Sequence, residues 1–440
     1  MTRKVLIIVE NSPVPADPRV WAEALALRRA GYQVSVICPG DSRRKLKWRE
    51  TIEGVHIYRH WAPREGLGRF SYLVEYLAAL PLEFALAVWV YLRRGFQVIQ
   101  GCNPPDTIFL VAAPFKLLGV KYIFDHHDAS PELYWAKYER RDFAYRIQVW
   151  LERLTYWFSD VVIATNESYR QLAIERGSRK PEQVFVVRNG PNLDRVKRLP
   201  LNPQWRKGKR FLVGYVGVMA EQDGLDLLVQ TAAHFKRTGR LDTHFACVGA
   251  GPSLESLRER VRALGLADMV TFTGRLPDRE MLEILSTADV CVNPDKPCEM
   301  NNISTMIKIM EYMALAKPIV QFESREGRVS AGESSLYADP RAGIQDFAEK
   351  IQWLLDHPKE REEMGALGRR RVDEKLAWKY SIPHLLAAYD RAFQRRGSKI
   401  APPEAGAGET KTAADLEPVA RESGTVEPSR AAAGRASSSC

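Results

Sequence analysis

The sequence predicts an α/β protein made of two halves, each a parallel sheet wound with helices on both faces. Short apolar runs alternate with amphipathic stretches along the chain, which is typical of strand–helix–strand units. The alternation stops at a polar, proline-containing connector at residues 199–209 and then restarts. With 440 residues, 45% of them hydrophobic, the chain is long enough for two domains and too apolar to be disordered throughout.

The expected strands are short apolar runs between amphipathic segments. In the first half they are residues 5–9, 34–38, 55–58, 98–100, 121–125, 161–164 and 184–187. In the second half they are residues 211–216, 244–248, 270–272, 290–292 and 319–321. Helices fill the gaps, and residues 19–30 illustrate the pattern, because Gly31 follows as a helix stop. The expected domains are residues 1–200, 201–377, a final helix at 378–396 and a tail at 397–440.

Two further segments bear on location. The tail is rich in Ala, Gly, Pro, Ser and Glu, which predicts disorder. Residues 77–92 are almost wholly apolar but contain Glu83 and are too short to span a membrane. This stretch fits a helix in the membrane interface and a buried helix of the domain equally well. No signal peptide opens the chain, and no CxxC pair occurs among six cysteines, so we expect a cytoplasmic protein with reduced thiols.

The positive charge is concentrated in the first half. The net charge is +10, and residues 41–70 hold 8 basic side chains against 4 acidic ones. This basic segment is either a solvated face or an attraction for an anionic membrane surface or a phosphorylated substrate. Nucleic acid is not expected as a partner, because no recognition motif accompanies the charge.

Several chemistries are excluded by missing motifs. There is no phosphate-binding P-loop, and Gly249-Ala250-Gly251-Pro252 lacks the third glycine of a dinucleotide fingerprint, so hydride transfer is not expected. No two aspartates lie two positions apart, so the DxD metal site of metal-dependent sugar transferases is absent. We therefore expect no metal and no cofactor, and a leaving diphosphate stabilised by protein groups.

The second half carries candidate phosphate and ribose ligands. Glycines after three successive strands, among them Gly217 and Gly251, allow a ligand to approach the backbone at the carboxyl ends of the strands. Ser304 is expected to cap a helix whose first amides, at residues 304–306, are free for phosphate oxygens. Lys308 and Glu311 share a face of that helix, and they either bind phosphate and ribose or form a plain surface ion pair.

The first half offers a second cluster. Asp125-His126-His127-Asp128 follows a predicted strand, and adjacent histidines point to different sides, so at most one enters a cleft. The alternative is a pair of partly buried loop histidines held by Asp125 and Asp128. Arg19 stands at a helix start, where a positive charge opposes the helix dipole, and this suggests a ligand.

At these residues the chain resembles the family 4 retaining glycosyltransferases over residues 1–395. The motifs that carry the resemblance are Asn11-Ser12-Pro13, Asp17-Pro18-Arg19-Val20, Asp125-His126-His127-Asp128, Pro131-Glu132, Gly214-Tyr215-Val216-Gly217, Val248-Gly249-Ala250-Gly251-Pro252, Phe272-Thr273-Gly274-Arg275, Glu311-Tyr312-Met313-Ala314 and Lys317-Pro318-Ile319-Val320. The resemblance implies the GT-B fold, with two Rossmann-like domains facing a central cleft, and a final helix that packs back on the first domain.

The resemblance also implies roles for the two halves. The second half would bind the nucleotide-sugar, with Glu311 on the ribose and Arg275 near the base. The first half would bind the acceptor, with His127 facing the transferred sugar. Three positions depart from the family pattern. Ile303 stands where a sugar-contacting glutamate is usual, and Val218 and Asp223 stand where an arginine and a lysine usually hold the diphosphate.

The predicted reaction is metal-free, retaining transfer of a sugar from a nucleoside-diphosphate sugar to a hydroxyl acceptor. The expected acceptor is a lipid-linked or cell-surface polysaccharide precursor at the inner membrane face. The alternatives are a nucleotide-sugar epimerase of the same shape and a non-catalytic nucleotide-sugar-binding protein. The expected catalytic residues are His127 and Lys308, and the expected substrate-binding residues are Glu311, Ser304, Thr305, Arg275, Gly217, Gly251, Glu299, Asn301, Asn302, Arg19 and Asp128.

Overall fold

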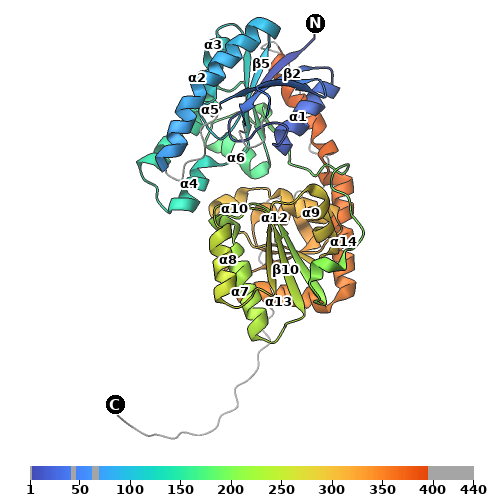
Figure 1. The fold of residues 1–440 in the computed structure, drawn as a ribbon. Helices are drawn as coiled ribbons and strands as arrows, with labels where there is room; N and C mark the ends of the chain where they lie inside the picture. Colours follow the sequence, from blue (N-terminus) through green and yellow to red (C-terminus); the bar gives the residue numbers. More distant parts are fainter. Residues whose placement is uncertain (1, 41–45, 62–68, 395–440) are drawn as a thin grey trace, which may run out of the picture. The chain divides into compact units, whose positions relative to one another are not determined.

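A computed structural model describes residues 2–40, 46–61 and 69–394, with only the backbone described at 69–78. These residues form two separate, mainly parallel sheets, each flanked by helices (Figure 1). The predicted tail at 397–440 lies outside the described residues. The fold class expected from the sequence is confirmed.

The first sheet has eight strands in the order β3-β4-β2-β1-β5-β6-β7-β8, and every neighbouring pair is parallel except β3 with β4. Its strands are β1 (Lys4–Val9), β2 (Gln33–Pro39), β3 (Arg49–Ile52), β4 (Val55–His60), β5 (Val98–Cys102), β6 (Lys121–His126), β7 (Val161–Ala164) and β8 (Val184–Val186). Its helices are α1 (Pro18–Arg29), α2 (Arg69–Arg94), α3 (Phe109–Lys116), α4 (Ser130–Tyr138), α5 (Phe143–Phe158) and α6 (Glu167–Glu175).

The second sheet has six parallel strands in the order β11-β10-β9-β12-β13-β14. They are β9 (Phe211–Val216), β10 (Thr243–Val248), β11 (Val270–Gly274), β12 (Val290–Asn293), β13 (Ile319–Phe322) and β14 (Ser335–Ala338). The helices of this half are α7 (Leu225–Arg237), α8 (Leu254–Ala263), α9 (Asp278–Thr287), α10 (Glu299–Ile303), α11 (Ile307–Ala314), α12 (Arg325–Ala331), α13 (Gly343–Asp356) and α14 (Pro358–Arg371).

The strand order reverses direction once in each sheet. In the first sheet the two directions diverge between β1 and β5, and in the second between β9 and β12. Open parallel sheets bind ligands beside such a reversal, outside the carboxyl ends of the strands. The strand order therefore points to the ends of β9 and β12 as a binding position in the second half.

Two edge strands were not expected from the sequence. β3 reads Arg-Glu-Thr-Ile and β14 reads Ser-Leu-Tyr-Ala, and neither is a continuous apolar run. Each pairs with one neighbour only. Edge strands are partly solvated, so they do not carry the apolar signal by which buried parallel strands are recognised.

Helix α2 packs as part of the first half. Its buried residues include Ala87 and Val90, which join the core around Leu6 and Ile8 of β1. The Trp89 ring contacts Tyr58 with 5.4 Å between ring centroids. In the part of α2 whose side chains are described, one face packs in the core, whereas Leu82, Phe84 and Leu92 are exposed, so the interfacial alternative for residues 77–92 stays a prediction. No described helix is both long enough and apolar enough to cross a membrane.

The last described helix, α15 (Ile382–Phe393), returns to the first sheet (Figure 1). It contacts α1 and β6–β8, and Leu385 and Tyr389 are fully buried in the core on that face. The Tyr389 hydroxyl donates a hydrogen bond to Gln100 Oε1 in β5. The end of the described chain thus completes a core that its first residues begin.

Candidate functional site

Glycine loops close the carboxyl ends of β9 and β10. Gly249 has a φ of +140°, and a Cβ there would lie 1.8 Å from the backbone oxygen of Gly217. A Cβ on Gly251 would lie 2.5 Å from the oxygen of Met219. Only glycine permits this approach of the two loops, because any side chain would separate them. Loop-to-loop packing next to the strand-order reversal thus requires glycine at 249 and 251, whereas a Cβ on Gly217 would lie 2.7 Å from the Tyr215 hydroxyl.

The segment after β12 differs from the sequence expectation. Residues 299–303, expected as a loop, form the short helix α10, and Ser304 ends that helix instead of capping the next one. Helix α11 begins at Ile307 after Met306, which provides no side-chain cap. The predicted N-cap at Ser304 is therefore wrong. Its hydroxyl lies 3.1 Å from the Tyr169 hydroxyl, and this neighbour was invisible in the sequence.

Lys308 lies in a ring of acidic and aromatic groups. Its Nζ donates a hydrogen bond to Asp295 Oδ1 at 2.6 Å and lies 4.0 Å from Asp223 Oδ1. The Tyr215 ring centroid is 4.9 Å away. Two carboxylates thus offset the ammonium charge, so Lys308 is not the unopposed cation that the sequence suggested. The predicted Lys308–Glu311 ion pair is also absent among the described contacts.

Asp223 brings negative charge to the same position. Burial raises the pKa of the Asp223 carboxyl to about 6, although the nearby Lys308 opposes the shift and Asp295 reinforces it. Asp223 is the residue that stands where the resembled family has a diphosphate-binding lysine. The local charge at this position is therefore governed by pH rather than fixed and positive.

An arginine from outside helix α11 holds the Glu311 side chain. Its Oε1 accepts a hydrogen bond from Arg195 at 3.1 Å, and Arg195 also pairs with Asp278 at 2.7 Å. Burial raises the pKa of Glu311, and Arg195 opposes this shift. The side chain of Glu311 is 13% exposed, so one face of it remains open to solvent.

A cavity of about 330 Å³ lies at the carboxyl ends of β12 and β13. Its lining includes three residues predicted as substitutes for the usual glutamate, namely Glu299, Asn301 and Asn302. The Asn301 amide donates to the backbone oxygens of Gln222 and Lys296, so it fixes the cavity wall. Asn302 Oδ1 accepts from the Arg325 amide, and Glu299 lies 3.5 Å from Arg141.

Two other predicted ligands have contrasting surroundings. Arg275 is exposed just after β11 and forms no ion pair with any described residue. Thr305 Oγ1 is within hydrogen-bond distance of Asn166 Nδ2, Arg188 and Glu326. Arg275 is therefore an exposed cation that can meet a ligand, whereas Thr305 already has hydrogen-bond partners within the protein.

Arg19 is buried in an acidic network of the first half. Its guanidinium lies 2.8 Å from Asp125 and 3.1 Å from Glu23, and it donates to the Val187 oxygen and to Asn189. The predicted ligand-facing arginine is therefore wrong. Asp125 and Glu23 compensate the unfavourable position of Arg19 at the start of α1.

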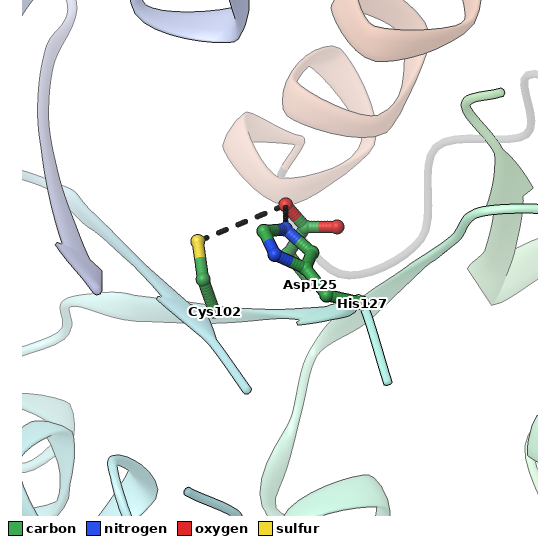
Figure 2. Close-up of side chains that lie close together, drawn as sticks. All are labelled: Cys102, Asp125 and His127. Atoms are coloured by element: carbon green, nitrogen blue, oxygen red, sulfur yellow. Dashed lines mark hydrogen bonds and ion pairs between the residues drawn. The ribbon is translucent and has the colours of Figure 1, made fainter. Parts of the chain in front are cut away.

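The two histidines point in different directions, as predicted. His126 is fully buried and stacks on Tyr169 at 4.6 Å between ring centroids. His127 is 11% exposed, and its Nε2 lies 2.6 Å from Asp125 Oδ2 (Figure 2). Burial disfavours the charged ring of His127, but the Asp125 carboxylate outweighs it and raises the pKa of His127. Asp128, next in sequence, is exposed and hydrogen-bonded to Asn103 through its backbone.

Cys102 completes the group drawn in Figure 2, with its Sγ 3.7 Å from Asp125 Oδ2. Cysteine, aspartate and histidine are metal ligands, and their donor atoms are close together. However, Arg19 and Gln100 already contact the two oxygens of Asp125. The guanidinium supplies the positive charge that a metal ion would bring, so this group fits a buried hydrogen-bond network and not a metal site.

Several important residues could not be identified from the sequence. Asp295, Arg195, Gln100 and Tyr389 each contact a predicted site residue or its partner, yet none belongs to a motif. Of these four residues, Asp295 was the easiest to identify from the sequence, because it follows the strand β12 by two residues. Arg195 contacts Glu311 across 116 positions and gave no such signal.

Comparisons with known proteins agree with this geometry. Residues 16–190 match the family described as glycosyl transferase 4-like domain, and residues 210–357 match the family described as glycosyl transferases group 1. The chain therefore belongs to the glycosyltransferases with these two domains. Among solved structures, it is similar to sucrose-phosphate synthase from Thermosynechococcus elongatus, with a TM-score of 0.72, 18% identity and coverage of 89% and 99% of the two chains. It is also similar to Anabaena HepE in complex with UDP-glucose, with a TM-score of 0.66 and 16% identity. This match covers 88% of the present chain and 99% of HepE. These neighbours have the GT-B fold.

Relatives with named activities match over different lengths. The α-D-kanosaminyltransferase of Streptomyces kanamyceticus is 29% identical over 38% of this chain and 42% of its own length. The 2-deoxystreptamine glucosyltransferase of the same organism is 25% identical over 71% of this chain and 82% of its own length. A GDP-mannose-dependent phosphatidylinositol monomannoside mannosyltransferase of Mycobacterium tuberculosis is 29% identical over 42% of this chain and 49% of its own length. Two of these three matches span less than half of the relative.

Proposed function

We propose that the protein transfers a sugar from a nucleoside-diphosphate sugar to a hydroxyl acceptor with retention of configuration. The observation that carries the proposal is the partly exposed Glu311 on α11, whose first turn has no side-chain cap, in the half whose strand order reverses between β9 and β12; the exposed Arg275 after β11 is a further candidate ligand. A ribose diol can donate to Glu311, and phosphate oxygens can accept from Arg275 and from the first amides of α11. The UDP-glucose complex of HepE, a similar fold, supports a donor of this class.

The proposed chemistry needs no nucleophile from the protein. The bond between the anomeric carbon and the diphosphate oxygen breaks, and the acceptor oxygen bonds to the same face of the sugar. The acceptor proton passes to the departing diphosphate. Charge that grows on the diphosphate is stabilised by protein donors, so no metal is proposed at this position. Because His127 is held by Asp125 and is partly exposed, it is the residue proposed to contact the transferred sugar from the first half.

We also propose that the acceptor is a lipid-linked or cell-surface glycan precursor reached at a membrane surface. Helix α5 supports this, because large apolar side chains line its outward face. The outward positions repeat at helical spacing and are Phe143, Ile147, Trp150 and Trp157. Trp150 is 59% exposed and Trp157 is 75% exposed, while Glu152 is fully buried.

Two exposed arginines of α5 strengthen the argument. Arg146 and Arg153 lie beside the apolar stripe, and no described residue forms an ion pair with either. An outward stripe of aromatic residues with arginine at its margin is typical of a helix in the membrane interface. The membrane-binding element proposed here is therefore α5, in place of the stretch in α2 that the sequence suggested.

The test is a donor screen followed by product analysis. We expect nucleoside diphosphates and one nucleotide-sugar to raise the unfolding temperature, and Glu311→Ala to abolish the rise. NMR of the anomeric proton in the product would then establish whether configuration is retained. Release of an altered sugar nucleotide without acceptor would support an epimerase, and donor binding without any turnover would support a binding protein.

A further inference from the structure

Three buried titratable side chains meet beneath α2, outside the residues assigned to donor and acceptor. Glu10 follows β1, His60 ends β4 and Glu83 lies in α2. Their residues are 3%, 5% and 1% exposed. One ligand atom from each lies within 4.8 Å of the other two.

The strand and helix periods bring these residues together. Side chains alternate along β1, so Glu10 points to the same face as Leu6 and Ile8, which pack in the core that α2 covers. His60 shares that face with Tyr58 by the same alternation. Glu83 lies four residues before Ala87, a buried residue of α2 in the same core, and so shares its helical face.

These polar groups are not satisfied by the described protein. Neither carboxylate oxygen of Glu10 and neither of Glu83 accepts a hydrogen bond from any residue in the described ranges, and His60 Nε2 makes none either. Burying an unpaired carboxylate costs several kcal/mol, so native proteins neutralise such groups. Two carboxylates here require compensating positive charge, and no described lysine or arginine forms an ion pair with them. His60 Nε2, 3.1 Å from Glu10 and 4.0 Å from Glu83, would supply that charge only in its protonated form.

The orientation of the His60 ring indicates which positively charged group could bind between the two carboxylates. Its Nδ1 lies 3.0 Å from the backbone oxygen of Trp61 and can approach it only as a donor. In the neutral ring, Nε2 then presents a lone pair toward the carboxylates. A histidine whose second nitrogen donates to a backbone carbonyl is the usual arrangement of a metal-ligating imidazole.

The distances also fit a single cation. His60 Nε2 lies 3.1 Å from Glu10 Oε2 and 4.0 Å from Glu83 Oε1. Ligands about 2.1 Å from one metal centre are separated by roughly 3–4 Å, so small side-chain movements suffice. We propose that Glu10, His60 and Glu83 bind one divalent cation of the Zn²⁺ or Mn²⁺ type, which ties α2 to the ends of β1 and β4. This site is separate from the diphosphate, for which the metal-free proposal stands.

The competing arrangement is a shared proton. Burial and the proximity of Glu10 raise the pKa of Glu83 well above its usual range, so a protonated Glu83 could also relieve the repulsion. A proton and a divalent cation are distinguished by metal content and by spectroscopy.

The first experiment uses the full-length wild-type protein. After treatment with a chelator and return to metal-free buffer, Zn²⁺, Mn²⁺ and Co²⁺ are added separately, with Mg²⁺ for comparison. We expect one bound ion per chain by elemental analysis, a higher unfolding temperature, and visible absorption bands with Co²⁺. Absence of both bound metal and a temperature shift would overturn the proposal in favour of the shared proton.

Two variants locate the ion. Glu83→Gln should abolish metal binding and the Co²⁺ bands, whereas the unfolding temperature of the metal-free protein should be unchanged or higher. Glu132→Gln is the matched control, since Glu132 is an equally buried carboxylate paired with Arg176 elsewhere in the same half. This control should retain one bound ion. Unaltered metal binding by Glu83→Gln would place the ion elsewhere and contradict the assignment.

Discussion

At the residue scale, Lys308 shows how tertiary contacts change the role that a motif suggests. Its ammonium is neutralised by Asp295 and approached by Asp223. A lysine in this setting stabilises the loop that follows β12 and brings little net positive charge to a phosphate. We therefore expect its loss to affect stability first, and turnover only through the loop.

Replacing Lys308 tests this role. Lys308→Ala should lower the free energy of unfolding by about 3–5 kcal/mol, because Asp295 would remain buried without its partner. Denaturant unfolding provides the measurement. The double variant Lys308→Ala, Asp295→Asn should recover much of the loss. A stable Lys308→Ala protein with kcat reduced on the order of 10²–10³ would instead support direct stabilisation of the diphosphate.

Asp223 should make donor binding depend on pH. Its pKa is raised to about 6, so the folded state binds this proton more tightly than the unfolded chain does. The stability contribution is therefore full below the ordinary carboxyl pKa and is lost as pH rises through about 6. The carboxylate that forms above this pH would repel a diphosphate, so the affinity for a nucleoside diphosphate should fall as pH rises.

The matched variant is Asp223→Asn. At neutral pH it should bind a nucleoside diphosphate more tightly, on the order of fivefold, which corresponds to about 1 kcal/mol for removing one nearby like charge. Its affinity should also be flat across the pH range in which the wild type changes. Calorimetric titration at several pH values checks both statements. An identical pH profile in the two proteins would show that the diphosphate lies elsewhere.

At the scale of elements, hydropathy suggested α2 as a candidate membrane-interface helix, whereas the structure exposes an apolar stripe on α5. One face of the apolar stretch of α2 packs inside the domain through Ala87 and Val90, while Leu92 on the same helix is 78% exposed. The more polar α5 turns its aromatic side chains outward and buries Glu152. Mean hydropathy identifies apolar segments, but it does not show which face of a helix the tertiary structure leaves uncovered.

Membrane binding should therefore depend on α5. Trp150→Ser and Trp157→Ser should each weaken co-sedimentation with anionic vesicles on the order of tenfold, since each removes a large exposed aromatic side chain. Trp353→Ser, on α13 of the second half, is the control and should bind as the wild type does. Binding should weaken further as salt screens Arg146 and Arg153. Vesicle binding that is unchanged by both α5 substitutions would refute the interfacial role.

At the scale of the whole molecule, the two ends of the described chain depend on each other. Tyr389 and Leu385 of α15 fill the core where this helix meets α1 and β6–β8, and Tyr389 reaches the network of Gln100, Glu23 and Asp125. A protein cut before α15 would expose this core to water. The first half is therefore not expected to fold without residues from the end of the chain.

Truncations test this dependence. Removal of residues 397–440 should leave the unfolding temperature unchanged, because their composition offers few large apolar side chains to a core. Removal of residues 378–440 should abolish cooperative unfolding of the first half. Tyr389→Phe should be intermediate and cost about 1–3 kcal/mol, since Gln100 Oε1 would lose its buried donor. Scanning calorimetry distinguishes the three, and a stable protein without α15 would contradict the argument.

The sequence by itself determined the elements whose signal is local. Short, mainly apolar runs predicted every central strand of both sheets, because strands buried on both faces carry mostly apolar side chains. The glycines at 217, 249 and 251 predicted close backbone approach, since only glycine tolerates it. The pairing of Lys308 with Asp295, of Glu311 with Arg195 and of Arg19 with Asp125 was decided only by the tertiary structure. Such pairs join positions 13, 116 and 106 residues apart, and the geometry that unites them exists only after the strands have found their order in the sheets.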